Sequence, residues 1–97
     1  MNINYFMNEA LIEANKAYQL NEVPVGAVII YEGKVVGEGH NNVIGDNDVT
    51  SHAEINAIRD ASKKIGNYRL TNCTMYVTLE PCHMCAKAIV DARLKSL

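Results

Sequence analysis

The hydrophobic residues at the start of the chain recur at steps of three and four. They are Ile3, Phe6, Met7, Ala10, Leu11, Ala14, Ala17 and Tyr18. Such spacing places side chains on one face of a helix, because an α-helix completes a turn about every 3.6 residues. The pattern therefore predicts an amphipathic helix that ends near Asn21, ahead of Pro24.

Two apolar segments follow and predict a β-hairpin. Residues 25–31 form a nearly continuous apolar run, which is typical of a strand that is covered on both faces. Glu32-Gly33 is a turn signal that leads into a second strand over residues 34–38. Residues 40–50 are rich in Asn, Asp and Gly and predict a loop.

The second half of the chain alternates between helix and strand. We expect a helix over residues 51–65, a β-branched strand over residues 73–79 and a last helix over residues 81–93. The order α-β-β-α-β-α predicts an α/β sandwich. Ligands of such folds bind beyond the carboxyl ends of the strands, where helix N-termini converge. The starts of the last two helices are therefore expected to share a site.

The composition fits a single domain spanning residues 1–97, with 48% hydrophobic residues and a net charge of −2. No apolar run reaches the roughly 20 residues of a membrane span, and no secretion signal is evident, so we expect a soluble cytoplasmic protein. Residues 51–97 hold seven Lys and Arg against four Asp and Glu. This excess is typical of a solvated surface and is too small for a dedicated nucleic-acid-binding module.

Cys82 and Cys85 open the last predicted helix at a spacing of three residues. Both thiols then lie on one side of the helix, where they can bind one tetrahedral metal ion. A helix N-terminus also favours the thiolate, which is the form that binds zinc. His52, at the start of the preceding helix, can complete a His/Cys/Cys set. Three protein ligands leave one tetrahedral position for water, which is typical of a catalytic zinc site.

Glu54 follows His52 by two residues and admits two interpretations. Ser51 and Glu54 match a capping box, in which the glutamate only satisfies a backbone amide at the helix start. Alternatively, Glu54 carries protons during a zinc-dependent hydrolysis. His-Ala-Glu followed by Pro-Cys-His-Met-Cys favours the second interpretation, because H-x-E with P-C-x-x-C is the signature of zinc deaminases that act on cytosine or adenine.

Further stretches extend this signature over essentially the whole chain. They are EVPVGAVI (residues 22–29), GEGHN (37–41), HAEINAIR (52–59), NYRL (67–70) and YVTLEPCHMCAKAIV (76–90). With them, the chain closely resembles the bacterial tRNA-specific adenosine deaminases of the TadA type, within the cytidine and deoxycytidylate deaminase superfamily. EVPVGAV and NYRL point to that branch more than to free-cytidine deaminases.

The resemblance implies a three-layer cytidine deaminase-like sandwich that lacks the last strands and helix of the full fold. It implies a zinc-dependent hydrolase that converts the wobble adenosine of tRNA to inosine. Zinc ligation then falls on His52, Cys82 and Cys85, proton transfer on Glu54 and substrate contact on Asn41. The implied partners are tRNA and a second copy of the chain in a homodimer, with no membrane.

The sequence also departs from the family pattern. Family members continue beyond this length with further strands, so we expect the third strand to be left as an exposed edge. Lys87 replaces a common glycine, and we expect it either to contact phosphate or to obstruct helix packing. His83 and Val49, the latter in place of a common proline, are not expected to bind the metal. Cys73 is expected to be a buried, inert thiol.

Three alternatives stay open at this point. The same zinc residues would serve a deaminase of a free nucleobase or nucleotide, such as cytosine, guanine or deoxycytidylate. A strand followed by CxxC at a helix start is also typical of thioredoxin-like dithiol oxidoreductases, although that interpretation leaves His-Ala-Glu unexplained. The third alternative is a truncated, noncatalytic remnant, or a subunit that works only with a partner chain.

Overall fold

The computed structural model describes residues 3–96. Its elements follow one another in the order α1 (Ile3–Gln19), β1 (Gly26–Tyr31), β2 (Lys34–His40), α2 (Val43–Asp46), α3 (Ala53–Ile65), β3 (Thr74–Val77), α4 (His83–Asp91) and β4 (Lys95–Ser96). The predicted order is confirmed, with two additions: the short helix α2 lies inside the predicted loop, and β4 follows the last predicted helix.

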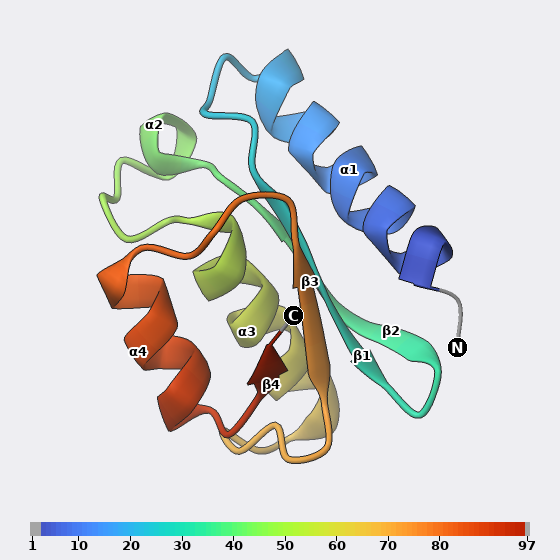
Figure 1. The fold of residues 1–97 in the computed structure, drawn as a ribbon. Coiled ribbons are helices and arrows are strands. Elements are labelled where there is room, and N and C mark those ends of the chain that lie inside the picture. Colours follow the sequence, from blue (N-terminus) through green and yellow to red (C-terminus); the bar gives the residue numbers. More distant parts are fainter. Residues whose placement is uncertain (1–2, 97) are drawn as a thin grey trace.

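The strands form one sheet in the order β2-β1-β3-β4. β1 runs antiparallel to both β2 and β3, and β4 runs parallel to β3. Helix α1 covers one face of this sheet, while α3 and α4 cover the other (Figure 1). The three-layer α/β sandwich that the sequence predicts is thereby confirmed.

The edge of β3 is less exposed than the sequence predicts. Thr74 pairs with Lys95, and Met75 pairs with Ser96, so that β4 covers the first half of β3. The prediction of a bare edge is therefore wrong for this half of the strand. β4 could not be predicted, because two residues are too few to show a periodicity.

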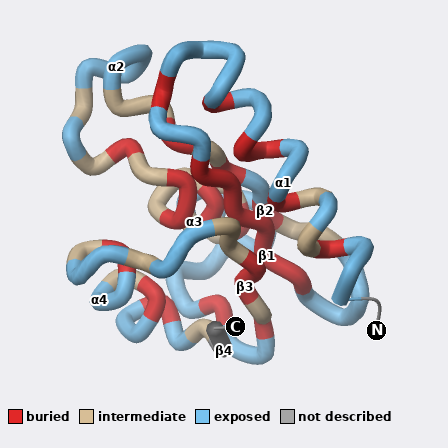
Figure 2. Tube along the Cα trace, turned by 45° about the horizontal axis from the view of Figure 1, so that its top comes forward, coloured by how far each residue is buried: buried red, intermediate tan, exposed pale blue. Residues whose placement is uncertain are grey.

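The central strands divide the core into two layers. Along β1, Ala27 and Ile29 belong to the core beneath α3 and α4, while Val28 and Ile30 belong to the core beneath α1. This alternation follows from the strand period of two residues. In Figure 2 the red, buried part of the trace accordingly runs through β1 and β3 and along the inner sides of the helices.

Helix α3 lies unusually close to β2. A Cβ atom added at Gly39 would collide with the backbone of Ala53 and Ala57, and one added at Gly37 would collide with the backbone and side chain of Ala61 and with the Ala57 carbonyl. The three alanines are spaced by four residues and are all fully buried. Small residues on both elements therefore allow the short distance between α3 and β2. His52 and Glu54 lie at the start of this helix.

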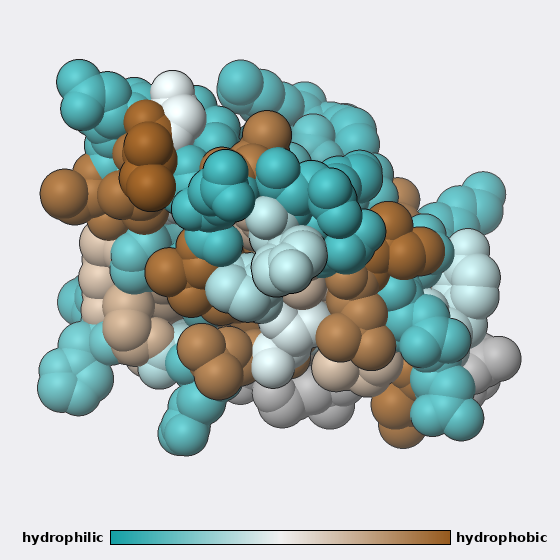
Figure 3. All heavy atoms as spheres, turned by 90° about the horizontal axis from the view of Figure 1, so that it is seen from above, coloured by the Kyte–Doolittle hydropathy of each residue, from teal (hydrophilic) through white to brown (hydrophobic). Residues whose placement is uncertain are grey.

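Among residues 3–96, none of the helices combines the length and the apolar character that a bilayer crossing requires. Seen from above, apolar side chains reach the surface in separate patches among polar ones (Figure 3).

Candidate metal centre and pocket

Three predicted ligands come together at the starts of two helices. His52 is the N-cap residue of α3, Cys82 is the N-cap residue of α4, and Cys85 lies in the first turn of α4. The Nδ1 atom of His52 lies 3.5 Å from Cys85 Sγ and 3.7 Å from Cys82 Sγ. All three ligand atoms lie within 4.8 Å of one another. The tertiary fold thus brings His52 and Cys82 together, although thirty residues separate them in the sequence.

These distances fit a tetrahedral zinc ion. Zn–N and Zn–S bonds of usual length, about 2.0 and 2.3 Å, separate the nitrogen from each sulfur by roughly 3.5 Å at the tetrahedral angle. The two separations in the structure, 3.5 and 3.7 Å, agree with this value. One imidazole and two thiols are also a donor set that zinc favours. The residues present therefore suit the metal in both chemistry and spacing.

The two cysteines differ in acidity. The backbone N–H of Cys85 holds the pKa of the Cys82 thiol below its usual range, with a further contribution from the N–H of Met84. Burial raises the pKa of the Cys85 thiol far above its usual range, and the Glu54 carboxylate raises it further. A bound cation would offset the rise at Cys85, because positive charge favours the thiolate. The buried thiol is therefore suited to a site that holds a cation.

Glu54 does not cap α3. A capping box would pair the Ser51 N–H with the Glu54 carboxylate, but the Ser51 N–H donates to the Asp48 carbonyl at 3.1 Å. The Ser51 hydroxyl donates to Asp46 Oδ2 at 2.6 Å. The capping interpretation is therefore wrong, and Glu54, only 4% exposed, lies beside the cysteines and the histidine instead.

Asn41 supplies the cap that Ser51 does not. The N–H of Ala53 donates to Asn41 Oδ1 at 2.7 Å, so the start of α3 is capped from the end of β2. The side chain is 8% exposed and lines the same pocket as His52 and Glu54. A residue that was expected only to contact a ligand thus also fixes the helix that carries His52.

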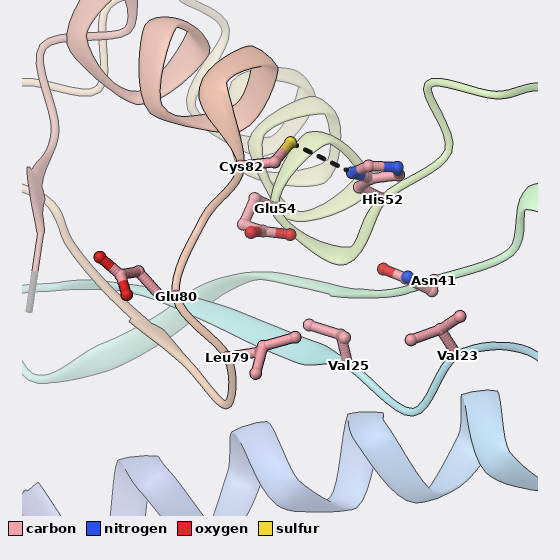
Figure 4. Close-up of a pocket in the computed structure, with 8 residues that line it drawn as sticks. All are labelled: Val23, Val25, Asn41, His52, Glu54, Leu79, Glu80 and Cys82. Atoms are coloured by element: carbon pink, nitrogen blue, oxygen red, sulfur yellow. Dashed lines mark hydrogen bonds between the residues drawn. The ribbon is translucent and has the colours of Figure 1, made fainter.

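A pocket of about 250 Å³ adjoins the cluster. It is lined by Val23, Val25, Asn41, His52, Glu54, Leu79, Glu80 and Cys82. Figure 4 shows the Glu54 and Asn41 side chains pointing toward the same space, with the apolar side chains of the pocket along its opposite side. The pocket therefore combines a carboxylate, an amide and a metal-ligating group with an apolar wall, as ligand sites commonly do.

Comparison with known proteins identifies the family. The model of the cytidine and deoxycytidylate deaminase zinc-binding region matches residues 1–97. The chain belongs to this deaminase family. The predicted zinc dependence is thereby supported by the family as well as by the His52, Cys82 and Cys85 cluster.

Relatives of this deaminase-family chain include tRNA-specific adenosine deaminases. That of Haemophilus influenzae is 53% identical over 92 residues, which cover 94% of this chain and 53% of the relative. That of Buchnera aphidicola subsp. Schizaphis graminum is 50% identical over 94 residues, which cover 97% of this chain and 62% of the relative. The expected resemblance to this group is confirmed. The chain spans less than two thirds of the length of both proteins.

Two solved structures have nearly the same fold. A structure from studies of A-to-I editing by tRNA:A34 deaminases has a TM-score of 0.92 and 48% identity, with 95% of this chain and 71% of that chain covered. Guanine deaminase from Bacillus subtilis has a TM-score of 0.94 and 43% identity, with 99% of this chain and 62% of that chain covered. Neither comparison supports the thioredoxin-like alternative.

The structure shows the surroundings of the residues that were expected to depart from the family pattern, and of the third cysteine. Lys87 is exposed on α4 and pairs with Asp91 at 2.7 Å, so it does not obstruct helix packing. His83 and Val49 are exposed, and neither belongs to the metal cluster. Cys73 is fully buried, and burial raises the pKa of its thiol, as expected of an inert cysteine.

The sequence interpretation missed the apolar wall and the acidic rim of the pocket. Val23 and Val25 precede β1, whereas Leu79 and Glu80 follow β3. A signal was available for Leu79 and Glu80, because they follow the carboxyl end of β3, where the ligands of such folds bind. Val23 and Val25 lie at the amino end of β1, which reaches the same edge only because β1 and β3 pair antiparallel.

Proposed function

We propose that residues 1–97 act as a single zinc-dependent deaminase domain that converts the wobble adenosine of tRNA to inosine. The observation that carries the proposal is the meeting of His52, Cys82 and Cys85 beside the buried Glu54 in one pocket. The tRNA-specific adenosine deaminases among the relatives favour this substrate. A cytoplasmic location and a homodimer are part of the proposal, since both fit the family resemblance.

His52, Cys82 and Cys85 would hold the zinc ion. When bound, zinc supplies Lewis-acid chemistry that makes water nucleophilic near neutral pH. The backbone N–H groups at the start of α4 favour the Cys82 thiolate before any metal binds.

Glu54 would move protons between water and the leaving group. Hydrolytic deamination replaces the C6 amino group of adenine by oxygen from water and releases ammonia. A carboxylate beside the reacting carbon can accept a proton from the attacking water and deliver it to the departing nitrogen. Glu54 is suited to this role because it is almost fully shielded from solvent and faces the pocket (Figure 4).

Asn41 and the apolar wall would orient the base. Because Asn41 Oδ1 accepts the Ala53 N–H, its amide NH₂ group is left to donate to an acceptor on the base or the ribose. Val23, Val25 and Leu79 offer apolar contact to the face of a flat ring. Together these residues would hold the target carbon above Glu54.

A second candidate is the deamination of a free purine base. It is favoured by the likeness to guanine deaminase, which is as close in fold as the likeness to the tRNA:A34 deaminase structure. The pocket lining does not separate the two, since substrate choice also depends on contacts to flanking nucleotides.

The deciding experiment combines metal analysis with a substrate comparison. The chain is purified under reducing conditions without added metal, and zinc is measured by elemental analysis. Inosine formation in tRNA is then compared with ammonia release from guanine, cytosine and deoxycytidylate. We expect about one zinc per chain and inosine in tRNA.

Each other outcome has its own meaning. Activity on free guanine alone would favour the second candidate. Zinc-free soluble protein that converts no substrate would favour a noncatalytic remnant or a subunit that needs a partner chain. A zinc-loaded but inactive chain would refute the proposed reaction while leaving the metal site intact.

A further inference from the structure

Glu22 is fixed at its backbone by the end of α1. Asn21 adopts a left-handed conformation with φ of 60°, which ends the helix. The N–H of Asn21 donates to the Tyr18 carbonyl at 3.1 Å, and that of Glu22 donates to the Ala17 carbonyl at 2.9 Å. This is a Schellman motif, which satisfies the last carbonyls of a helix. The position of Glu22 is thus determined by α1 and not by the loop it faces.

The Glu22 side chain reaches across to a different segment. Its carboxylate accepts the Ile44 N–H at 3.1 Å and the Gly45 N–H at 2.8 Å, both in α2. The residue is only 8% exposed. None of the ion pairs formed by residues 3–96 includes Glu22. The two backbone amides are therefore its structural partners, and it ties the end of α1 to α2.

The hydrogen bonds between Glu22 and α2 lie next to one wall of the pocket. Val23 and Val25, which directly follow Glu22 in the chain, line the pocket, as does Asn41 on the segment that leads to α2. The N–H of Asn41 donates to the Val25 carbonyl at 3.1 Å. Two links therefore join these segments, one through Val25 and one through Glu22. Figure 4 shows Val23 and Asn41 at the same end of the pocket, where these segments meet.

We infer that Glu22 is a positioning residue, which holds α2 against the end of α1 and thereby keeps Asn41 and Val23 in place for the substrate. The inference rests on the proposed function, because it assigns Glu22 a part in binding at that same pocket. Glu22 does not line the pocket, so it acts through its neighbours.

A carboxylate suits this role better than an amide. Both oxygens of a carboxylate accept hydrogen bonds, so both N–H groups are satisfied. In Glu22→Gln one of the two acceptors becomes an NH₂ group, which faces a backbone N–H and cannot bond to it. In Glu22→Asp the charge is kept, but the side chain is one methylene shorter and no longer reaches both amides.

The test uses the zinc-loaded full chain and three variants. Glu22→Gln and Glu22→Asp change the tie, and Glu32→Gln is the matched control, since Glu32 is exposed in the turn between β1 and β2. The measurements are zinc content, kcat and KM with a tRNA substrate, and amide hydrogen exchange at Ile44 and Gly45.

We expect both Glu22 variants to raise KM about tenfold, the factor that corresponds to the loss of one hydrogen bond. Their kcat and zinc content should stay near those of the unmodified chain, because Glu54 and the metal ligands are untouched. Exchange at Ile44 and Gly45 should accelerate about tenfold, while the amides of α3 stay protected. Glu32→Gln should change none of these quantities.

Unchanged KM and unchanged exchange in Glu22→Gln would overturn the inference. Loss of zinc together with exposure of the α3 amides would also overturn it, since Glu22 would then support the whole fold. A raised KM in Glu22→Gln together with an unchanged KM in Glu22→Asp would likewise overturn it, because charge and not the two hydrogen bonds would then set KM. If the unmodified chain holds zinc but deaminates nothing, the proposed function fails, and the exchange rates at Ile44 and Gly45 decide the inference on their own.

Discussion

On one face of the sheet, the start of α1 packs through bulky side chains: Phe6 contacts Tyr76 with ring centroids 5.4 Å apart, above Val28 and Ile30. On the other face, three buried alanines of α3 pack against the glycines of β2. The later part of α1 approaches the sheet as closely at Gly26, where an added Cβ would meet the backbone of Ala10 and Ala14. Bulky side chains can rearrange when one of them changes, whereas a helix backbone in contact with a strand cannot yield without moving as a whole.

The residues of the metal cluster and Glu54 lie on the face of the sheet that α3 and α4 cover. His52 and Glu54 lie at the start of α3, and the cysteines lie on α4 on the same face of the sheet. α1 carries none of the residues that line the pocket. Changes on the α3 face should therefore alter zinc binding or catalysis, whereas changes at the start of α1, away from the Glu22 contact with α2, should alter only the free energy of unfolding.

The largest effect is expected at Glu54. Glu54→Gln removes the proton carrier but keeps the size of the side chain, so the rate of inosine formation should fall by about 10²- to 10⁴-fold. Zinc content should be retained, because the three ligands are unchanged. The rate is measured by single-turnover assays and zinc by elemental analysis. A variant that keeps more than a tenth of the activity would remove Glu54 from the proposed mechanism.

Gly39→Ala tests the close approach of α3 directly. The added methyl group would collide with the Ala53 carbonyl and the Ala57 amide, so α3 must shift, at a cost of about 1 to 3 kcal/mol. Zinc affinity should fall as His52 moves with the helix. The control is Gly33→Ala, which should cost about 1 to 2 kcal/mol through its positive φ and leave zinc affinity unchanged. Equal zinc affinities in the two variants would contradict the comparison.

The thiols of the zinc-free, reduced chain should differ in reactivity. The pKa of Cys82 is lowered by the Cys85 N–H, so the Cys82 thiolate forms at lower pH and iodoacetamide should modify it first. The pKa of Cys73 is raised by burial, so modification there should need a higher pH or local unfolding. Mass spectrometry across a pH series reports the order. Prior modification of Cys73 would show that the α3 face is open without metal.

Phe6→Leu probes the opposite face. The substitution keeps an apolar side chain of similar bulk and should lower the free energy of unfolding by less than about 1.5 kcal/mol. Zinc content and the rate of inosine formation at saturating tRNA should not change. Urea denaturation measures the free energy of unfolding, elemental analysis measures the zinc content, and the deamination assay measures the rate. A loss of zinc in this variant would mean that the two faces are coupled, contrary to the comparison.

The smallest effect is expected at Lys87. Its ion pair with Asp91 is exposed and joins residues one turn apart, so Lys87→Ala should change the free energy of unfolding by less than about 0.5 kcal/mol. If Lys87 contacts phosphate, the variant would instead raise the KM for tRNA and weaken its dependence on salt concentration. Measuring KM at two salt concentrations separates these outcomes.

The sequence by itself determined the features that depend on neighbours along the chain. The periodicity of α1, the Glu32-Gly33 turn and the H-x-E and P-C-x-x-C motifs are local, so the order of elements and the candidates for metal ligation were predictable. The nearly continuous apolar run of β1 likewise predicted a strand that is buried on both faces. Each of these signals arises within a single helix, strand or turn.

Only the tertiary structure decided how distant segments meet. Glu22 bonds to α2 from more than twenty residues away, Asn41 instead of Ser51 caps α3, and β4 returns to pair with β3. Several oxygen atoms along the chain could accept a hydrogen bond from the same backbone N–H. The local sequence pattern does not show which of them will do so. Which hydrogen bonds form depends on how the helices pack on the sheet, because packing determines which donor and which acceptor come within bonding distance.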